Sequence, residues 1–484
     1  MAQRTQRGRG RPGPRPGPRR ATRADPVRRV AYDVLAAVDE RGAYANLMLP
    51  ALLRERGIEG RDAALATELT YGTLRGRQIY DAILDLCSDR PVADIDPPVR
   101  EVLRLGAHQL LATRVASHAA VATSVDLAKD VIGMRPAGFV NAVLRRVSTR
   151  DLDGWVAIIT PDRAADPVGY LAAAYSYPRW IVTAFADALD GDLTETEDTL
   201  RAGNTRPQTT LVAIPGISDQ AELTTAGDGA AAPAPWSPYG AVLPGGDPGA
   251  IAAVAQGRAF VQDEASQLVA LALAQASADP ADQAGEPWLD LCAGPGGKAA
   301  LLAGLADQAH RGSHLIASDL RPHRAGLTGE HLRRLPSAAT IAADGRAGAW
   351  RPGTFARVLA DVPCSGLGAL RRRPEARWRK SPEDVEGLVP LQRDLLNAAI
   401  DSARPGGVVG YVTCTPHQAE TEGVVADVLA ARDDVTVLDA PAILADALGR
   451  PVPGVSRGPG GQYVQLWPHR HGTDALFLAL LRRT

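Results

Sequence analysis

A carboxylate, a rigid turn and a thiol stand together in the segment Asp361-Val362-Pro363-Cys364-Ser365-Gly366. The apolar run Val358-Leu359-Ala360 before it is typical of a buried strand, so the segment should lie at a strand end. A cysteine in that place can attack an electrophile or a flipped base if a nearby positive charge or a helix N-terminus favours its thiolate. The alternative interpretation is a buried structural cysteine followed by a glycine turn.

A second thiol, Cys414, follows another apolar run in Thr413-Cys414-Thr415-Pro416. If the two strands are neighbours, both thiols face one crevice, because the carboxyl ends of parallel strands meet at one edge of the sheet. A free thiol has a pKa of about 8.5 and is mostly protonated at neutral pH. The sequence does not identify which of Cys364 and Cys414 receives help to ionise.

A glycine-rich turn connects a predicted strand to a predicted helix in Leu289-Asp290-Leu291-Cys292-Ala293-Gly294-Pro295-Gly296-Gly297-Lys298. Glycines let the backbone approach a ligand closely, and a helix N-terminus offers free N–H donors. The pattern is not a Walker motif, because Ala299 follows Lys298, and it is not GxGxxG. It suits a ligand that carries an α-amino-acid carboxylate or a nucleoside.

Three acids, Asp319, Asp344 and Asp361, end successive predicted strands. In a doubly wound sheet they would share a rim with the glycine loop, and an acid after the second strand suits ribose hydroxyls. Any one of them could instead cap a helix. Together they indicate a nucleoside-bearing cofactor.

A basic segment, Arg371 to Lys380, follows Cys364 and contains six basic residues, one acid and Trp378. Such a segment can bind phosphates, with the tryptophan available for stacking. A solvated loop is the alternative.

The composition describes a soluble globular protein of several domains: 484 residues, 45% hydrophobic, 22% charged, with a net charge of −2. Residues 1–24 contain eight arginines and no acid, which predicts a disordered basic arm able to attract phosphates. The four cysteines are far apart, without zinc-ligand spacing, so neither disulfides nor a metal site are expected. No apolar run suggests a membrane span or a secretory signal, so we expect a cytoplasmic protein, and we expect a monomer because no coiled-coil pattern occurs.

The apolar spacing predicts an all-helical domain over 25–150, a linker over 148–165, a small α+β domain over 166–262 and an α/β domain over 263–484. In the first domain, helices are expected at 26–38, 62–86, 98–111, 118–131 and 137–147, and Arg75, Arg77, Arg145 and Arg146 could form a basic helical surface. In the small domain, a helix is expected at 178–189, a strand at 209–213 and a mobile loop at 226–235. In the last domain, strands are expected at 288–292, 314–319, 339–344, 357–361, 408–413, 435–438 and 476–481, with helices at 298–308, 382–402 and 418–431. Short apolar strands that alternate with helices predict a mostly parallel, doubly wound, Rossmann-like sheet.

The motifs LDLCAGPGGK, DVPCSGLGALRRRPEARW and TCT together resemble the RNA 5-methylcytosine methyltransferases that use S-adenosylmethionine, over about residues 165–484. The stretches Ala66–Arg75 and Gly138–Arg146 resemble the helical domain shared with the antitermination factor NusB. That fusion is similar to the RsmB/Sun branch, which acts on 16S ribosomal RNA. The resemblance also implies that the middle segment is RRM-like.

The resemblance implies a role for each motif residue. The glycine-rich loop would hold the methionine part of S-adenosylmethionine, through Cys292, Ala293, Gly294, Pro295, Gly296, Gly297 and Lys298. Asp319 would bind the ribose of the cofactor, and Asp344 would lie near its adenine. Arg324 is also expected among the cofactor-binding residues. Asp361 would contact both the cofactor region and the cytosine. Cys414 would be the nucleophile, and Cys364 would promote breakdown of the covalent adduct.

Two residues depart from the family pattern: Thr415 stands where Ser is usual, and Glu420-Thr421 replaces Glu-Asn. The second change puts a local contact in doubt. Other functions remain open: a DNA cytosine methyltransferase with Cys364 as its nucleophile, a 5-methylcytosine methyltransferase of another RNA such as tRNA, and a non-catalytic NusB-like RNA-binding factor.

Overall fold

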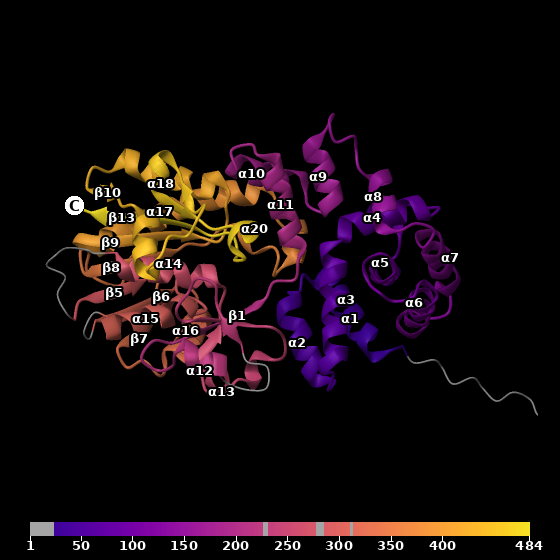
Figure 1. Ribbon diagram of the computed structural model, residues 1–484, viewed down its shortest axis with the longest axis horizontal. Helices are drawn as coiled ribbons and strands as arrows, with labels where there is room; N and C mark the ends of the chain where they lie inside the picture. The colour runs from indigo at the N-terminus through magenta and orange to yellow at the C-terminus, as the bar shows by residue number, and fades with distance from the viewer. Residues whose placement is uncertain (1–23, 226–230, 277–284, 310–312) are drawn as a thin grey trace, which may run out of the picture. The chain divides into compact units, whose positions relative to one another are not determined.

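The computed structural model describes residues 24–225, 231–276, 285–309 and 313–484. The expected basic arm therefore lies outside the described residues, except for Ala24. The chain divides into two compact units between Ile158 and Ile159. Each unit is described by itself below (Figure 1).

The first unit is helical, as predicted. Its first helix shows why the chain folds this way: the Asp25 carboxylate accepts the Val27 N–H, Pro26 opens the helix, and Gly42 ends it at φ 64°. Fully buried side chains such as Val30 and Leu69 form the core. The helices are α1 Pro26–Arg41, α2 Ala45–Glu55, α3 Gly60–Arg75, α4 Arg77–Cys87, the 3-10 helix η1 Val92–Asp94, α5 Pro97–Ala112, α6 Ser117–Val131, α7 Ala137–Val147 and α8 Leu152–Ile159.

Three details of this unit differ from the prediction. Helix α2 was not predicted, and a single helix over 62–86 is in fact two, α3 and α4, separated at Gly76. A Cβ at Gly76 would lie 2.5 Å from the ring of Tyr80, so the chain comes too close there for a larger residue. The predicted linker over 148–165 does contain the boundary between the two units, but it is partly helical, because it includes α8 with Trp155 buried.

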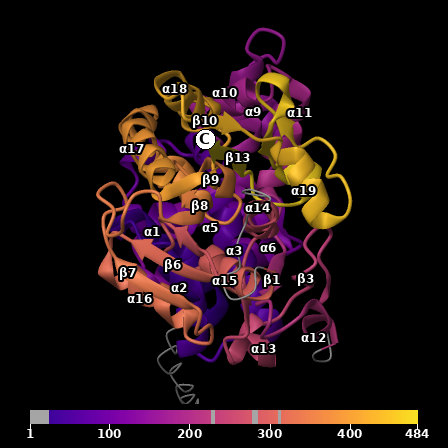
Figure 2. The same cartoon turned by 90° about the vertical axis from the view of Figure 1, so that its left-hand side faces the viewer.

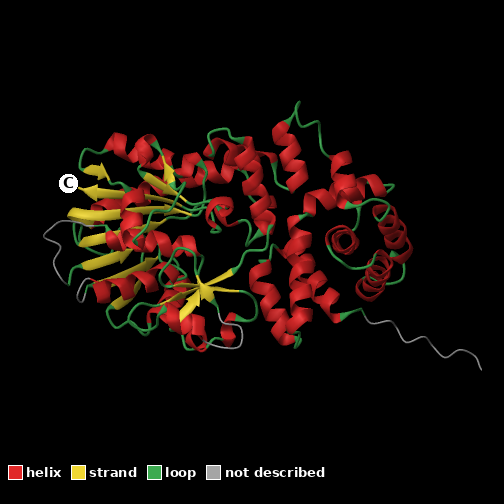
Figure 3. Cartoon of the chain, in the orientation of Figure 1, coloured by secondary structure: helices red, strands yellow, loops and turns green. Residues whose placement is uncertain are grey.

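The second unit begins with three helices, α9 Pro167–Tyr175, α10 Arg179–Ala188 and α11 Leu193–Asn204. A four-stranded antiparallel sheet of order β2-β3-β1-β4 follows, and Figure 3 shows it apart from the larger sheet. Helix α10 and strand β1 confirm two predicted elements, whereas β3 and β4 were missed. The remaining elements here are β1 Thr209–Ala213, α12 Gln220–Thr225, β2 Ala232–Pro233, β3 Gly240–Leu243, η2 Pro248–Ala250, α13 Ala252–Ala255 and β4 Ala259–Val261.

The loop predicted over 226–235 was wrong at its end, where β2 pairs with β3. Residues 226–230 lie outside the described residues. The predicted domains 166–262 and 263–484 both fall within the second compact unit.

The large sheet has the order β11-β12-β13-β9-β8-β5-β6-β7, and β10 pairs with β13. Its five neighbours β9, β8, β5, β6 and β7 are parallel, while β13 runs antiparallel to β9. The predicted doubly wound sheet is confirmed, and β11 and β12 were missed. The strands are β5 Pro287–Asp290, β6 His314–Asp319, β7 Ala338–Ala342, β8 Phe355–Asp361, β9 Ala403–Thr413, β10 Val435–Val437, β11 Ser456–Arg457, β12 Tyr463–Gln465 and β13 Phe477–Arg483.

Helices cover both faces of this sheet (Figures 1 and 2). Successive residues of a strand point to opposite faces of the sheet. In β13, Leu478 and Leu480 therefore pack with α14 and α15 on one face, whereas Phe477 and Leu481 pack with α17 and α18 on the other. The helices are α14 Glu264–Gln275, α15 Gly297–Ala309, α16 Pro322–Leu332, η3 Leu367–Ala369, η4 Pro374–Trp378, α17 Pro382–Ser402, η5 Gln418–Glu420, α18 Glu422–Ala431, α19 Ala440–Leu448, η6 Pro459–Gly461 and α20 Pro468–His471. The helix predicted over 418–431 is thus interrupted at Thr421, where the backbone leaves the helical conformation.

Candidate active site

The two thiols lie at the ends of neighbouring strands. Strands β8 and β9 are parallel, with Asp361 opposite Val412, so the segments that follow them leave the sheet side by side. The Sγ atoms of Cys364 and Cys414 are 3.3 Å apart, and both thiols are free. The expected closeness of the two cysteines at the ends of neighbouring strands is therefore confirmed.

Each thiol alters the ionisation of the other. The hydrogen bond from Cys364 lowers the pKa of Cys414. Burial and Asp361 oppose this shift, and the charge of Lys298 supports it. The same hydrogen bond, together with burial, raises the pKa of Cys364 well above its ordinary value. The geometry thus favours a Cys414 thiolate beside a protonated Cys364.

Lys298 supplies the positive charge at this site. It follows the first residue of α15, and its Nζ lies 2.8 Å from Oδ2 of Asp361 at the end of β8. Burial lowers the pKa of Lys298, but Asp361 more than compensates and the net pKa is raised. The sequence placed Lys298 in the cofactor loop and did not reveal that its ammonium group pairs with Asp361.

The glycine loop is held by residues of the next strand and helix. Oδ2 of Asp319 accepts the Gly294 N–H at 3.1 Å, and Arg324 donates to the Gly294 carbonyl. A Cβ at Gly294 would lie 2.4 Å from Asp319, and Gly296 has a φ of 114°, so both positions need glycine. The predicted loop, Asp319 and Arg324 are therefore brought together at the start of α15.

Asp290 was part of the quoted motif but was not predicted as a site residue. It ends β5 and is 1% exposed, and neither carboxylate oxygen has a hydrogen-bond partner of normal geometry among the described residues. Burial, reinforced by Asp361, raises the pKa of Asp290 to about 8. Burial also raises the pKa of the neighbouring Cys292, so this thiol stays protonated. A strand pattern that is apolar except for one acid was the signal available in the sequence.

Asp344 lies two residues after β7, on the same rim of the sheet as Asp319. Its carboxylate accepts two hydrogen bonds from the Arg346 guanidinium, at 3.1 and 2.7 Å, and this pairing lowers the pKa of Asp344. The acid is therefore ionised at neutral pH.

Only part of the basic segment after Cys364 can form the phosphate-binding surface that its composition predicted, because Arg373 and Arg379 are exposed whereas Arg371 and Arg377 are buried. Arg371 and Arg372 both donate to Asp263 and Asp474, in a network whose two acids have side chains at most 10% exposed. An isolated buried carboxylate is costly, so four charges that neutralise one another are a structural unit rather than a free cationic surface.

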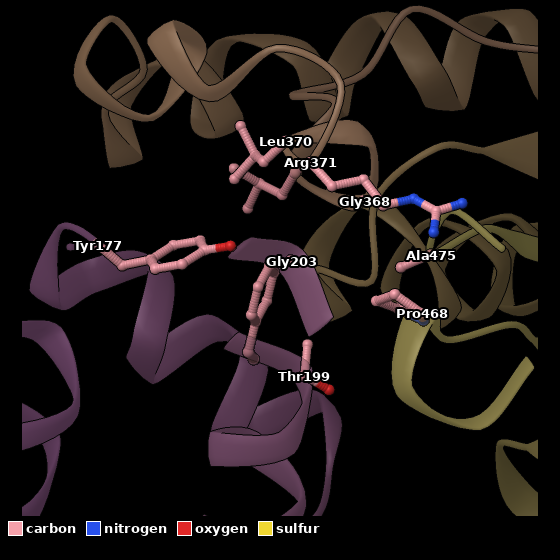
Figure 4. A pocket seen from close by; sticks show the side chains of 10 residues that line it. Tyr177, Thr199, Gly203, Gly368, Leu370, Arg371, Pro468 and Ala475 are labelled. Carbon is pink, nitrogen blue, oxygen red and sulfur yellow. The ribbon is translucent and has the colours of Figure 1, made fainter. Parts of the chain in front are cut away.

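Arg377 is fully buried as well. Its guanidinium lies 3.6 Å from the centre of the Tyr177 ring and donates to the Tyr177 hydroxyl and to the carbonyls of Ser176 and Gly203. Figure 4 shows Tyr177 and Gly203 facing Leu370 and Arg371 across a small cavity. The segment thus fastens α9–α11 to the loop that carries Cys364.

The basic helical surface expected in the first unit is also smaller than predicted. Arg75 is 8% exposed, and Arg77 pairs with Asp39 at 3.3 Å. Arg145 and Arg146 are exposed, with Arg146 at 2.9 Å from Asp89.

Across the described ranges, no group of three or more His, Cys, Asp or Glu residues could hold a metal ion. In the same ranges, no helix is long and apolar enough to cross a bilayer.

Comparisons with known proteins match both units. A family model described as 16S rRNA methyltransferase RsmB/F matches residues 279–482, and the NusB family model matches residues 25–149. Rv1407 of Mycobacterium tuberculosis (strain H37Rv), which is named as a methyltransferase, is 51% identical over 467 residues, or 96% of this chain and 98% of that protein. The ribosomal RNA small subunit methyltransferase B of Pseudomonas syringae pv. tomato is 31% identical over 463 residues, covering 94% of this chain and 96% of that protein. The crystal structure of PH0851 is similar in fold, with a TM-score of 0.74 at 20% identity over 95% of this chain and 99% of that one.

Proposed function

Because the chain belongs to the RsmB/F family of methyltransferases, we propose that it transfers a methyl group from S-adenosylmethionine to carbon 5 of a cytosine in 16S ribosomal RNA. The observation that carries this proposal is the pair of free thiols, Cys364 and Cys414, whose Sγ atoms are 3.3 Å apart at the ends of neighbouring strands. Methylation of a carbon that is a poor nucleophile needs one thiol to activate the base, and a second group to assist release.

The residues around the glycine loop fit S-adenosylmethionine. The N-terminus of α15 offers N–H donors for a carboxylate. The buried Asp290 oxygens, which have no partner of normal geometry among the described residues, suit an ammonium group. Asp319 stands at the end of the second strand, where a ribose is commonly bound. When bound there, S-adenosylmethionine would supply an electrophilic methyl group on a sulfonium.

Cys414 is the proposed nucleophile. Its thiolate, favoured by the hydrogen bond from Cys364 and by the charge of Lys298, would add to carbon 6 of the cytosine. That addition gives carbon 5 the character of an enamine carbon, which can then accept a methyl group. The thiolate is regenerated when the carbon 6–sulfur bond breaks.

Cys364 is the proposed base for release. Its raised pKa depends chiefly on the hydrogen bond with Cys414, and the negative charge of Cys414 adds to it. Both effects end when the Cys414 sulfur becomes a neutral thioether. Cys364 can then lose its proton to water and accept the proton that leaves carbon 5.

Asp361 is the proposed partner of the cytosine's N3 edge. It ends β8 between the glycine loop and the thiols, and the Lys298 ammonium holds its Oδ2. The Lys298 ammonium would offset the negative charge that develops on the base when Cys414 adds. The Asp361 carboxylate would accept a hydrogen bond from N3 after N3 takes a proton from water. Addition also requires the target base to leave any stack, which costs a few kcal/mol unless the RNA is already open.

The proposed substrate, 16S ribosomal RNA, rests on the names of the relatives and of the family model, and on the NusB match of residues 25–149. The test is methyl transfer by the full chain to unmodified 16S RNA, with tRNA and DNA in parallel, analysed on denaturing gels. Cys414→Ala should abolish transfer and form no adduct, whereas Cys364→Ala should accumulate a covalent protein–RNA species. The reverse pattern would contradict the roles of the two thiols, and activity on tRNA or DNA alone would contradict the substrate.

A further inference from the structure

A buried carboxylate that the proposed chemistry does not use lies behind the two thiols. Glu420 ends η5 and is 0% exposed. Its Oε1 accepts the Ser365 N–H at 2.7 Å and the Gln392 Nε2 at 3.0 Å, and its Oε2 accepts the Ser365 hydroxyl at 2.5 Å. These donors are neutral, so the carboxylate is held by hydrogen bonds rather than by a counterion.

The bonds of Glu420 reach the residues that follow both thiols. Ser365 follows Cys364 and Thr415 follows Cys414, and their hydroxyl oxygens are 3.1 Å apart. The Ser365 hydroxyl has one proton, which goes to the charged acceptor because such bonds are the stronger ones. The Thr415 hydroxyl must then donate to Ser365 Oγ. Glu420, Ser365 and Thr415 thus form one chain that connects the two loops.

Further bonds fix the backbone on either side of the thiols. Gln392 Nε2 also donates to the Pro363 carbonyl at 2.9 Å, so the residues before and after Cys364 are both held. The Tyr411 hydroxyl donates to the Glu420 carbonyl at 2.8 Å, which ties η5 to β9. The Cys414 carbonyl accepts the Gly368 N–H at 2.9 Å. The separation of the thiols therefore depends on a frame of hydrogen bonds with Glu420 at its centre.

The charge of Glu420 also differs in its effect on the two thiols. Cys364 is faced by Glu420 and Asp361, both of which disfavour its ionisation. Cys414 is faced by Asp361 and Asp474, which disfavour its thiolate, and by Lys298, which favours it. Glu420 is thus among the main groups that disfavour ionisation of Cys364, and it is not among the main influences on the pKa of Cys414.

We propose that Glu420 is a positioning residue that holds the two thiol-bearing loops at hydrogen-bond distance and keeps the shared proton on Cys364. Cys414 then carries the thiolate before RNA arrives. This inference rests on the proposed function, because the roles of the two thiols do, but the distribution of the proton between them can be measured without RNA or cofactor.

The first experiment alkylates the full chain with iodoacetamide between pH 6 and 9 and quantifies each cysteine by mass spectrometry. Both thiols are partly exposed, so the reagent can reach them. In the wild type, Cys414 should react first. In Glu420→Gln, which keeps the shape and removes the charge, the ratio of Cys364 to Cys414 modification should rise about tenfold, equivalent to one pKa unit. The control Glu422→Gln removes the same charge two residues away, where the acid pairs with Arg457 at 3.0 Å, and should leave the ratio unchanged.

The second experiment separates position from charge. Ser365→Ala keeps the Glu420 side chain and breaks the chain of hydroxyls, so it should lower kcat for methyl transfer about tenfold while the KM for RNA stays as in the wild type. An unchanged ratio in Glu420→Gln, or a Ser365→Ala enzyme with wild-type kcat, would overturn the proposal. If the wild type itself methylates no cytosine, the proposed function fails, while the alkylation ratios still decide the role of Glu420.

Discussion

Lys298 Nζ lies 2.8 Å from Asp361 Oδ2, and this ion pair joins the first turn of α15 to the end of β8. The two side chains are 13% and 27% exposed. The pair therefore connects the glycine loop of the proposed cofactor site with the strand end that leads to Cys364. The positive charge of Lys298 also favours the Cys414 thiolate.

Lys298→Met should slow adduct formation and move its pH dependence to higher pH. Loss of the ammonium group removes an influence that lowers the pKa of Cys414, so less thiolate is present at neutral pH. The rate of covalent protein–RNA formation, measured from pH 6 to 9, tests this. Lys129→Met is the matched control, because Lys129 pairs with Asp126 on α6 in the helical unit. A Lys298→Met profile that coincides with the wild type would contradict the role of the lysine.

Cys364→Ala should form its adduct with an alkaline-shifted pH profile, in addition to accumulating it. The hydrogen bond from Cys364 is the main cause of the lowered pKa of Cys414, so its loss raises that pKa. Adduct formation should fall below the new pKa and recover above it. Cys364→Ser is the comparison variant, because a hydroxyl can still donate to Cys414. Equal profiles for the two variants would show that the hydrogen bond has no effect on Cys414.

The sequence predicted the order of strands and helices in the α/β unit because apolar strands of four to seven residues alternate with helices. It also predicted that Cys364 and Cys414 are neighbours, since successive parallel strands are commonly adjacent. What it could not predict depends on contacts between distant residues. The basic segment is the clearest case: Arg371 and Arg372 have their partners about 100 residues away, at Asp263 and Asp474.

Short elements were the other limit. Strands β2, β4, β11 and β12 are two or three residues long, which is too short for an alternating pattern to be seen. The importance of Asp290 was hidden for a different reason. An acid at a strand end predicts a crevice residue, but only the fold shows that its carboxylate is buried without a normal partner.

Asp290→Asn should stabilise the protein at high pH. The pKa of this carboxyl is about 8 in the folded chain against an ordinary value of 3.8. The folded state therefore binds the proton more tightly, and the contribution of Asp290 to stability falls as the pH rises from about 4 to 8. The neutral amide removes that loss, so the difference in urea midpoint between variant and wild type should increase from pH 5 to pH 8.5. Asp344→Asn, at an acid whose pKa is lowered, should show no such increase.

Arg377→Met should destabilise the fold without weakening RNA binding directly. The change leaves the carbonyls of Ser176 and Gly203 without their donor, and it removes the guanidinium from the Tyr177 ring. Removing buried charged hydrogen bonds of this kind costs about 2–4 kcal/mol. Urea unfolding measures the loss of stability, and Lys380→Met in the same segment should stay within about 0.5 kcal/mol of the wild type.

Under native conditions the salt dependence of RNA affinity should be the same for Arg377→Met and the wild type, because a buried arginine neutralises no phosphate. A shallower salt dependence would restore the phosphate-binding interpretation of this segment.

Thr415→Ser should be nearly silent, whereas Thr415→Val should impair methyl transfer. The Thr415 hydroxyl lies 3.1 Å from Ser365 Oγ and accepts the His417 N–H at 3.2 Å, so the hydroxyl is what the site uses and the methyl group is dispensable. Serine keeps both bonds. Valine has the shape of threonine but removes the hydroxyl that bonds to Ser365 Oγ and the acceptor of the His417 N–H, in a place where Thr415 is fully buried. The connection between the two thiol loops is then looser. We expect kcat within about twofold of the wild type for Thr415→Ser and a loss of about tenfold or more for Thr415→Val.

A Thr421→Val variant controls for loss of a nearby hydroxyl, because the Thr421 hydroxyl donates to the carbonyls of His417 and Gln418 and not to Ser365. If Thr415→Val keeps full activity, the hydroxyl chain between the loops does not determine how the thiols are placed.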